Sequence, residues 1–404
     1  MNKLLVFATI ALGITLPFQD QFSTIAMALI LACGLAQQFL SEKPAKIGTL
    51  KPFLLIAVLL ILPRITGLFY GQWDNATKEL LRSAPLVVIP LSLLLLSKHE
   101  RAHQIRRWFF YGLLIGITLL AIVCYYPVVT TMISEQQPLS YLLRWRYMNF
   151  NFTSPLEDGH PAYLGLLICW LLAHIFFTQY LKSQWRPVVG LLLTTLLFQL
   201  VARNALLVAG ILWLIYIMKT NIRWLQLSAV GLLLLCVGAV VLHPSNYLKD
   251  KFFYIFSEEA KARENTRFDR LEASFEVFKD APIFGPGPGE DNELRMQAYK
   301  TMGEEIAFQN NYNAHNQFVE FLSTFGLYGL CCFLLAIFLI TRLLWRSKNW
   351  LDFYLWIGIL VAMITESLLE RSLGVKYMSI LVAFILLNQL ISKREDHLSD
   401  GRRS

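Results

Sequence analysis

The sequence predicts an all-α polytopic membrane protein with about twelve membrane-spanning helices. Two observations carry this prediction. First, 56% of the 404 residues are hydrophobic and only 16% are charged, whereas soluble proteins have roughly 45–50% apolar and about 25% charged residues. Second, the apolar residues gather in runs long enough to cross a bilayer. This composition excludes a soluble globular enzyme, a disordered chain and a secreted disulfide scaffold.

The expected spans follow one another along the whole chain, so we assign residues 1–404 to one integral membrane domain. The first apolar run resembles the core of a signal peptide. No small-residue cleavage site follows it and a second apolar run begins at once, so we expect it to be the first spanning helix. The expected spans are residues 4–18, 24–40, 53–70, 83–97, 109–129, 161–180, 187–202, 204–218, 225–243, 316–341, 351–367 and 376–391.

The distribution of Lys and Arg predicts the orientation in the membrane. When the spans alternate, the short basic connections at 43–51, 98–107 and 342–348 all fall on the same side. Because basic connections stay in the cytoplasm, we expect both termini to be cytoplasmic. The two long connections, about 130–160 and about 244–314, then form a smaller and a larger loop on the outer side.

The larger outer loop carries a mixed-charge stretch at 257–270, and the apolar residues after it predict an amphipathic helix on the protein or membrane surface. These residues recur at helical spacing: Leu271, Phe275 and Phe278. Asp280-Ala281-Pro282 ends the helix, and Gly285-Pro286-Gly287-Pro288-Gly289 predicts a rigid turn. No Lys-Ser/Thr follows these glycines and no strand precedes them, which excludes a phosphate-binding P-loop.

Arg203 is the first candidate site residue, because apolar residues surround it on both sides. One interpretation is an arginine that extends to the outer lipid headgroups. The functional interpretation is a fixed cation that faces a phosphate, since a guanidinium bonds two oxygens at once.

Two histidines lie where expected spans begin on the outer side. His315 precedes Asn316 and an apolar run, which is also the pattern of a simple helix cap. His160-Pro161-Ala162-Tyr163 begins another span, where a histidine beside an interfacial tyrosine is the plain alternative. A histidine nevertheless titrates in the range that suits proton transfer near neutral pH.

Further charged residues are expected on the same outer side. Arg267 and Arg270 are three residues apart and share a helix face, although exposure to water is the usual fate of such charges. Glu366 and Arg371 close the eleventh expected span, and the plain alternative is that they pair with each other or with a neighbouring arginine. Together, these residues suit a site for an anionic, lipid-attached substrate.

Several motifs resemble the bacterial O-antigen ligase family and the related O-antigen polymerases. The signature is His315-Asn316 followed after nine residues by Gly326-Leu327-Tyr328-Gly329. The resemblance covers about residues 155–375. Its other elements are Ala202-Arg203-Asn204, the Asp280–Gly289 segment, His160–Tyr163 and Thr365-Glu366-Ser367. This chain has Asn204 after Arg203, where relatives often have a small residue.

The resemblance implies an inner-membrane enzyme similar to the C-type membrane glycosyltransferases. Such an enzyme moves a glycan from undecaprenyl pyrophosphate to an acceptor, typically a lipid A-core sugar, on the periplasmic face. The family is thought to need neither a metal nor ATP, so no cofactor is expected. The implied partners are this donor, the lipid A-core or another glycan acceptor and membrane lipids, with no nucleic acid.

The resemblance also implies roles for individual residues. His315 would activate the acceptor hydroxyl or contact the pyrophosphate, and Arg203 would bind the pyrophosphate. Arg267 or Arg270 would assist, with the choice left open. The remaining candidates for substrate binding, orientation or acceptor contact are His160, Tyr163, Asn316 and Glu366.

Two alternative functions stand beside the ligase. An O-antigen or exopolysaccharide polymerase would use the same donor and share the motifs. A polysaccharide transporter without catalysis would instead place charged residues near the middle of the bilayer on broken helices. Here the ionisable residues gather at the outer end, with Arg64 beside Pro63 as the main exception, which favours an enzyme.

Overall fold

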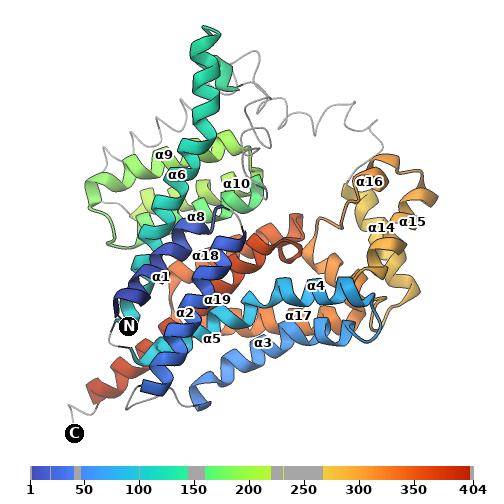
Figure 1. Ribbon diagram of the computed structural model, residues 1–404, viewed down its shortest axis with the longest axis horizontal. Helices are drawn as coiled ribbons and strands as arrows, with labels where there is room; N and C mark the ends of the chain where they lie inside the picture. Colours follow the sequence, from blue (N-terminus) through green and yellow to red (C-terminus); the bar gives the residue numbers. More distant parts are fainter. Residues whose placement is uncertain are drawn as a thin grey trace. The chain divides into compact units, whose positions relative to one another are not determined.

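A computed structural model describes residues 2–18, 20–40, 47–99, 101–143, 160–219, 231 and 267–400. The regular secondary structure of these residues is entirely helical (Figure 1). The all-α prediction is confirmed for this part of the chain. Each expected span overlaps a described helix except 225–243, of which only residue 231 is among the described residues.

Several described helices have the length and composition of membrane spans. Four are long and apolar enough: Gln21–Leu40, Ala102–Ser134, Gln317–Ser347 and Ser372–Ile391. Shorter apolar helices cover Lys3–Thr15, Pro161–Phe177 and Trp350–Thr365. These helices support a membrane protein, while the total of about twelve spans stays a prediction.

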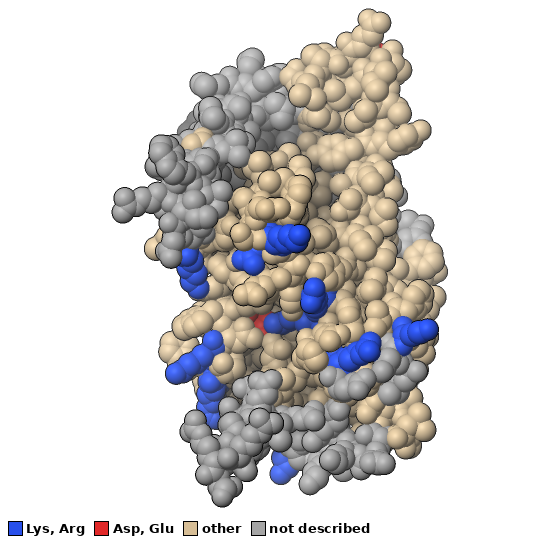
Figure 2. Space-filling view, turned by 90° about the vertical axis from the view of Figure 1, so that its left-hand side faces the viewer, with Lys and Arg blue, Asp and Glu red and all other residues tan. Residues whose placement is uncertain are grey.

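The charged surface seen in Figure 2 is dominated by basic side chains. Almost all the charged residues that show there are Lys or Arg, with very little Asp or Glu. Such a surface fits the basic connections between the expected spans. The assignment of both termini to the cytoplasm stays a prediction.

The chain divides into two compact units. The first unit comprises Met1–Thr9, Thr24–Trp108 and Glu264–Ser404, and the second comprises Ile10–Ser23 and Phe109–Arg263. One membrane domain can contain two helical units, so the assignment of 1–404 to a single domain stays a prediction.

The first unit is built around two helices that come late in the chain. Helix α19 (Ser372–Asp400) packs along α5 (Pro85–Leu95), and α17 (Gln317–Ser347) packs along α3 (Ile47–Gly67). In α19 the residues from Val375 to Leu387 are nearly all buried, as expected for a helix that is apolar all round. Helix α18 (Trp350–Thr365) completes this group by packing against α17.

Helix α17 contains a kink at Gly326, where φ is +62° and ψ is −164°. The N–H groups of Leu327 and Tyr328 donate to the carbonyls of Pro282 and Ile283 at 2.9 and 3.0 Å. A Cβ on Gly326 would lie 2.5 Å from the Ile283 carbonyl oxygen. The glycine of the sequence signature is therefore the point where the segment before α15 docks into a broken helix.

The larger outer loop is helical over much of its described part. It contains α14 (Arg267–Asp280), α15 (Glu290–Met302) and α16 (Glu305–Gln309). The expected glycine-proline turn lies between α14 and α15, where the Gly287 N–H donates to the Thr324 carbonyl at 2.9 Å. At Gly285, φ is +70° and a Cβ would lie 2.2 Å from that same carbonyl oxygen, so the predicted rigid turn is confirmed.

The amphipathic helix of the larger loop is present as α14, but its buried face differs from the expected one. The helix ends at Asp280, as predicted. Its buried residues are Ala273, Ser274 and Val277, whereas Phe275 is 42% exposed. Small side chains face the protein because they allow α14 to pack closely on α15 and α17.

The second unit is centred on α8 (Pro161–Phe177), which packs against α9 (Arg186–Leu200) and α10 (Arg203–Lys219). Most residues of α8 are buried, and the rings of Trp170 and His174 stack with centroids 3.6 Å apart. The unit also contains most of α6 (Ile105–Ser134). The smaller expected loop begins within α6, and its residues 144–159 lie outside the described residues.

The kink in α17 yields a first prediction. We expect Gly326→Ala to lower the free energy of unfolding by about 1–3 kcal/mol from backbone strain alone, with a further loss from the contact with Ile283. The thermal midpoint of the detergent-purified protein measures this effect. Gly210→Ala is the control, because no atom lies within 4 Å of its Cβ position; its midpoint should be unchanged or higher. Equal midpoints for both variants would contradict the prediction.

Candidate functional site

The backbone just before α17 sets the position of His315. This residue has a φ of +47°, and its N–H donates to Asn313 Oδ1 at 3.1 Å. The adjacent Asn316 is the helix cap, since its Oδ1 accepts from the N–H groups of Phe318 and Val319 at 3.0 and 3.1 Å. The capping role that sequence alone allowed for His315 therefore belongs to Asn316, and the imidazole makes other contacts.

The imidazole of His315 pairs with Glu366. The Nδ1 atom lies 3.2 Å from Glu366 Oε2, and both side chains are partly buried. Glu366 directly follows α18, and its N–H donates to the Ala362 carbonyl at 2.9 Å. A carboxylate at Nδ1 favours the tautomer with its proton on that atom and leaves Nε2 as the basic nitrogen. The pair therefore has the arrangement of a general base.

Of the candidate arginines of α14, one lies near this pair and the other contacts a tyrosine beside it. Arg267 Nη2 lies 4.0 Å from Glu366 Oε1. The Arg270 guanidinium lies over the Tyr312 ring, 4.0 Å from its centroid, and the rings of Tyr312 and His315 meet edge to face with centroids 6.0 Å apart. We call these five residues the His315 cluster.

Glu366 is thus paired with His315 and lies close to Arg267, whereas Arg371 is exposed.

Burial lowers the pKa of Arg270, and the neighbouring Tyr312 and Tyr299 oppose that change. An arginine remains charged near neutral pH. The His315 cluster therefore offers one basic nitrogen, one carboxylate and two cations on a partly exposed surface.

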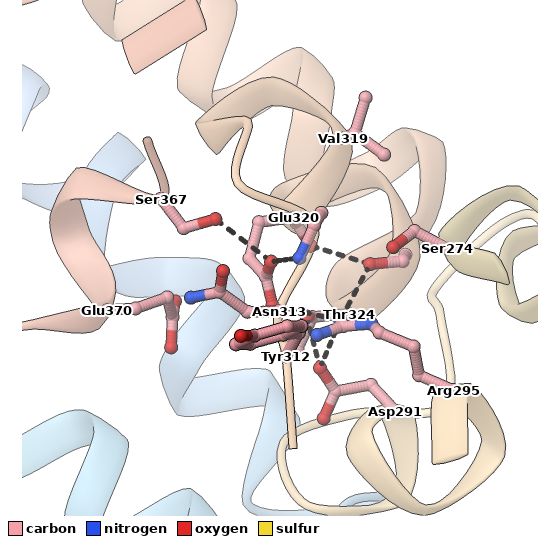
Figure 3. Close-up of polar contacts among 12 residues, drawn as sticks. Ser274, Asp291, Arg295, Tyr312, Asn313, Val319, Glu320, Thr324, Ser367 and Glu370 are labelled. Atoms are coloured by element: carbon pink, nitrogen blue, oxygen red, sulfur yellow. Dashed lines mark hydrogen bonds and ion pairs between the residues drawn. The ribbon is translucent and has the colours of Figure 1, made fainter. Parts of the chain in front are cut away.

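A buried carboxylate beneath the cluster holds the two halves of the pair in place (Figure 3). Glu320 Oε2 accepts from the Ala314 N–H at 2.8 Å and from the Ser367 hydroxyl at 3.1 Å. Ala314 precedes His315 and Ser367 follows Glu366. The same carboxylate therefore binds the residue next to each member of the pair, Ala314 through its backbone and Ser367 through its side chain.

Glu320 is itself neutralised by Arg295 of α15. Arg295 Nη2 lies 2.9 Å from Glu320 Oε1 and 3.3 Å from Asp291 Oδ2. Burial alone would lower the pKa of Arg295, but the carboxylates of Glu320 and Asp291 hold it above its ordinary value. Burial raises the pKa of Asp291, and Arg295 opposes this. Sequence reasoning missed this group, although an acidic residue inside the apolar start of α17 was a usable signal.

A second group of ion pairs explains Arg64, the exception noted in the sequence. Arg64 is fully buried, with Nε 3.0 Å from Glu79 Oε1. Arg82 pairs with two carboxylates: its Nη2 lies 2.7 Å from Glu79 Oε2, and its Nη1 lies 3.3 Å from Glu370 Oε2. Arg64 and Glu79 come from α3 and α4 (Trp73–Ser83). The arginine therefore has a carboxylate partner within the helical core.

Burial, together with the carboxylates of Glu79 and Glu320, raises the pKa of Glu370 to about 8, despite the opposing effect of Arg82. The carboxyl group of Glu370 therefore holds its proton more tightly than an exposed glutamate does.

Three sequence-predicted site residues belong to the second unit. Arg203 is the first residue of α10. His160 precedes α8 with Pro161 at its first turn, and the rings of His160 and Tyr163 meet edge to face with centroids 5.0 Å apart. Their participation in one site with the His315 cluster stays a prediction. Among the described residues, no group of three or more His, Cys, Asp or Glu is placed to hold a metal ion.

The buried carboxylate yields a second prediction. We expect Glu320→Ala to destabilise the protein by about 3–5 kcal/mol, because the substitution leaves Arg295 buried with one partner fewer. Thermal unfolding in detergent measures this loss. Glu276→Ala is the matched control: Glu276 pairs with Lys279 at 2.6 Å on an exposed surface, where such a pair contributes about 0–1 kcal/mol. A Glu320→Ala midpoint equal to that of the control would refute the structural role.

The raised pKa of Glu370 yields a third prediction. The ordinary value of 4.5 rises to about 8 in the folded protein, so protonation of this carboxyl favours folding. Its contribution to stability is complete below pH 4.5 and is lost as the pH rises through about 8.

Glu370→Gln imitates the protonated form. The thermal midpoint of this variant should therefore gain on that of the wild type as the pH rises from about 5 to about 8.5. Glu276→Gln should show no such trend. A constant difference between Glu370→Gln and wild type over this range would contradict the prediction.

Comparison with known proteins relates this region of the chain to a protein family. Residues 188–334 match the family model of the O-antigen ligases. No curated protein matches the chain. The matched region includes Arg203, both arginines of α14, His315 and the Gly326 kink. The middle of the chain is therefore similar to the O-antigen ligase family, which confirms the resemblance that the motifs indicated.

Proposed function

We propose that this protein is an O-antigen ligase-like glycosyltransferase. It moves a glycan from undecaprenyl pyrophosphate to an acceptor sugar, typically of lipid A-core, on the periplasmic face of the bacterial inner membrane. The observation that carries the proposal is the contact between His315 and Glu366, with Arg267 and Arg270 beside it. The family match, which covers His315, Arg267 and Arg270, supports the same activity.

In the proposed reaction His315 acts as the general base. Its Nε2 takes the proton of the acceptor hydroxyl while the hydroxyl oxygen forms a bond to the anomeric carbon of the donor glycan. The bond between that carbon and the phosphate oxygen breaks, and undecaprenyl pyrophosphate leaves with the bonding electrons. Glu366 holds the imidazole at Nδ1 and stabilises the imidazolium that forms.

The arginines stabilise the leaving group in this proposal. Negative charge grows on the pyrophosphate as the bond breaks, and a fixed guanidinium lowers the energy of that state. Arg267 is the more exposed of the two, while Arg270 is oriented by Tyr312. Arg203 is proposed as a further pyrophosphate-binding residue. Fixed cations thus supply the charge that a divalent ion supplies in other glycosyltransferases.

The fourth prediction concerns the reacting residues. We expect His315→Ala and Arg203→Ala each to abolish attachment of the surface glycan while the protein stays in the membrane. Gel analysis of the surface glycan measures transfer, and immunoblotting of membranes measures abundance. His103→Ala is the control, because His103 is an exposed histidine outside the cluster. If both variants supported full-length transfer at normal abundance, the site assignment would be wrong.

A deletion of the gene separates the ligase from the polymerase. A ligase defect leaves long glycan chains on the lipid carrier, because polymerisation continues without transfer. A polymerase defect leaves single repeat units attached to the core. Analysis of carrier-linked and core-linked glycans in the deletion strain therefore distinguishes the two functions, and unchanged glycans would contradict both.

A further inference from the structure

A polar pocket lies next to the His315 cluster within the first unit. Its volume is about 320 Å³, near the lower end of the ~300–1,000 Å³ range of ligand pockets. Residues of α4, the Pro288-Gly289 turn, α15 and the segment before His315 line it. We call it the amide pocket because carboxamides are prominent in its wall: Gln72, Asn75, Asn292, Asn311 and Asn313.

The amide pocket shares its wall with the segment that carries His315. Asn313 lines the pocket and accepts the His315 N–H. Glu320 also lines the pocket and accepts the Ala314 N–H. Figure 3 shows Asn313 and Glu370, a further lining residue, on the same side of this segment. Only the backbone between Asn313 and His315 would therefore separate a ligand in the pocket from the proposed general base, His315.

The chemistry of the lining favours an uncharged ligand rich in hydroxyl groups. A carboxamide both donates and accepts hydrogen bonds, and so does a hydroxyl group. Acidic residues outnumber basic ones in the wall, where Glu79, Asp291, Glu293, Glu320 and Glu370 face Lys78, Arg82 and Arg295. Arg82 and Arg295 are already paired with carboxylates of the wall, so a pyrophosphate would find few cations to bind it there. Phe325 adds an aromatic surface at the buried end of the pocket, against which a sugar ring can pack.

The arginines of α14 belong to a different part of the surface. Neither Arg267 nor Arg270 lines the amide pocket, and α14 contributes no lining residue among those described. The charged leaving group and a neutral sugar would thus be met by separate sets of side chains. This separation assigns the pocket to the acceptor rather than to the donor pyrophosphate.

We propose that the amide pocket binds an uncharged sugar of the acceptor glycan, next to the hydroxyl group that His315 activates. This inference rests on the proposed function. It adds how the acceptor is recognised: carboxamides and carboxyl groups of the pocket form hydrogen bonds with the hydroxyl groups of the acceptor sugar. Phosphate groups near that sugar weaken its binding to the pocket.

The fifth prediction uses binding as its readout, independent of transfer. The probe is the oligosaccharide released from the host's own lipid A-core by mild acid hydrolysis and then dephosphorylated. Its affinity for the full-length protein in lipid nanodiscs is measured by saturation-transfer NMR titration. Inorganic pyrophosphate is the second probe. A transfer assay follows in parallel, so that binding and chemistry are scored separately.

Two substitutions alter the pocket to different degrees. Asn292→Trp fills it and should weaken oligosaccharide binding by about tenfold or more. Asn75→Ala removes one carboxamide and should weaken binding roughly threefold to tenfold. Gln297→Trp is the matched control, because Gln297 is exposed on the same helix as Asn292 and does not line the pocket. Its binding should equal that of the wild type.

The second probe and the catalytic variant separate the two proposals. Pyrophosphate binding should be unchanged in both pocket variants and weakened by Arg267→Ala. His315→Ala should still bind the oligosaccharide while transfer is lost. If the wild type does not bind the oligosaccharide, or if Asn292→Trp and Asn75→Ala bind it as well as Gln297→Trp, the acceptor pocket is wrong. If pocket variants lose pyrophosphate instead, the pocket is an anion site and the inference fails. Full transfer by His315→Ala would overturn the proposed function instead.

Discussion

The buried carboxylate of Glu320 is the interaction on which the arrangement of the site depends. It accepts hydrogen bonds from Ala314 and Ser367 and pairs with Arg295. A charge removed from water is tolerated only when such partners surround it. Because those partners lie on three separate segments, satisfying one carboxylate fixes the start of α17, the end of α18 and the helix α15 together. The contact between His315 and Glu366 follows from this constraint.

Because of the kink at Gly326, α17 contacts α15 and the segment before it in two ways, with side chains before the kink and with backbone N–H groups at the kink. Before the kink, α17 carries Glu320 and Thr324, which face the outer loop. At the kink, the N–H groups freed from the helix bind the carbonyls of Pro282 and Ile283. Thr324 connects the two regions, because its carbonyl accepts from Gly287 and its hydroxyl donates to Asp291 at 2.7 Å. The glycine-proline turn is thus part of the framework that positions Arg295, and through it Glu320.

The distribution of charge around His315 gives the site two distinct sides. On one side α14 presents two guanidinium groups, as a departing pyrophosphate requires. On the other side the amide pocket presents carboxamides, which suit the uncharged sugar proposed as its ligand. Asn313 and His315 lie on the segment that separates them. A donor with a charged leaving group and an acceptor without charge are the two substrates that such a surface can tell apart.

Local sequence determined the helices, because runs of apolar residues and helix-ending signals act over a few neighbouring positions. It also singled out His315, Glu366, Arg267 and Arg270 as candidates, since charged residues beside a membrane span are costly without a role. The pairing of these residues depended on the tertiary structure. The partner of Glu366, the buried face of α14 and the capping role of Asn316 were not fixed by spacing. Glu320 and Arg295 were missed because their partners lie on segments far apart in the chain, and only packing decides which buried charges meet.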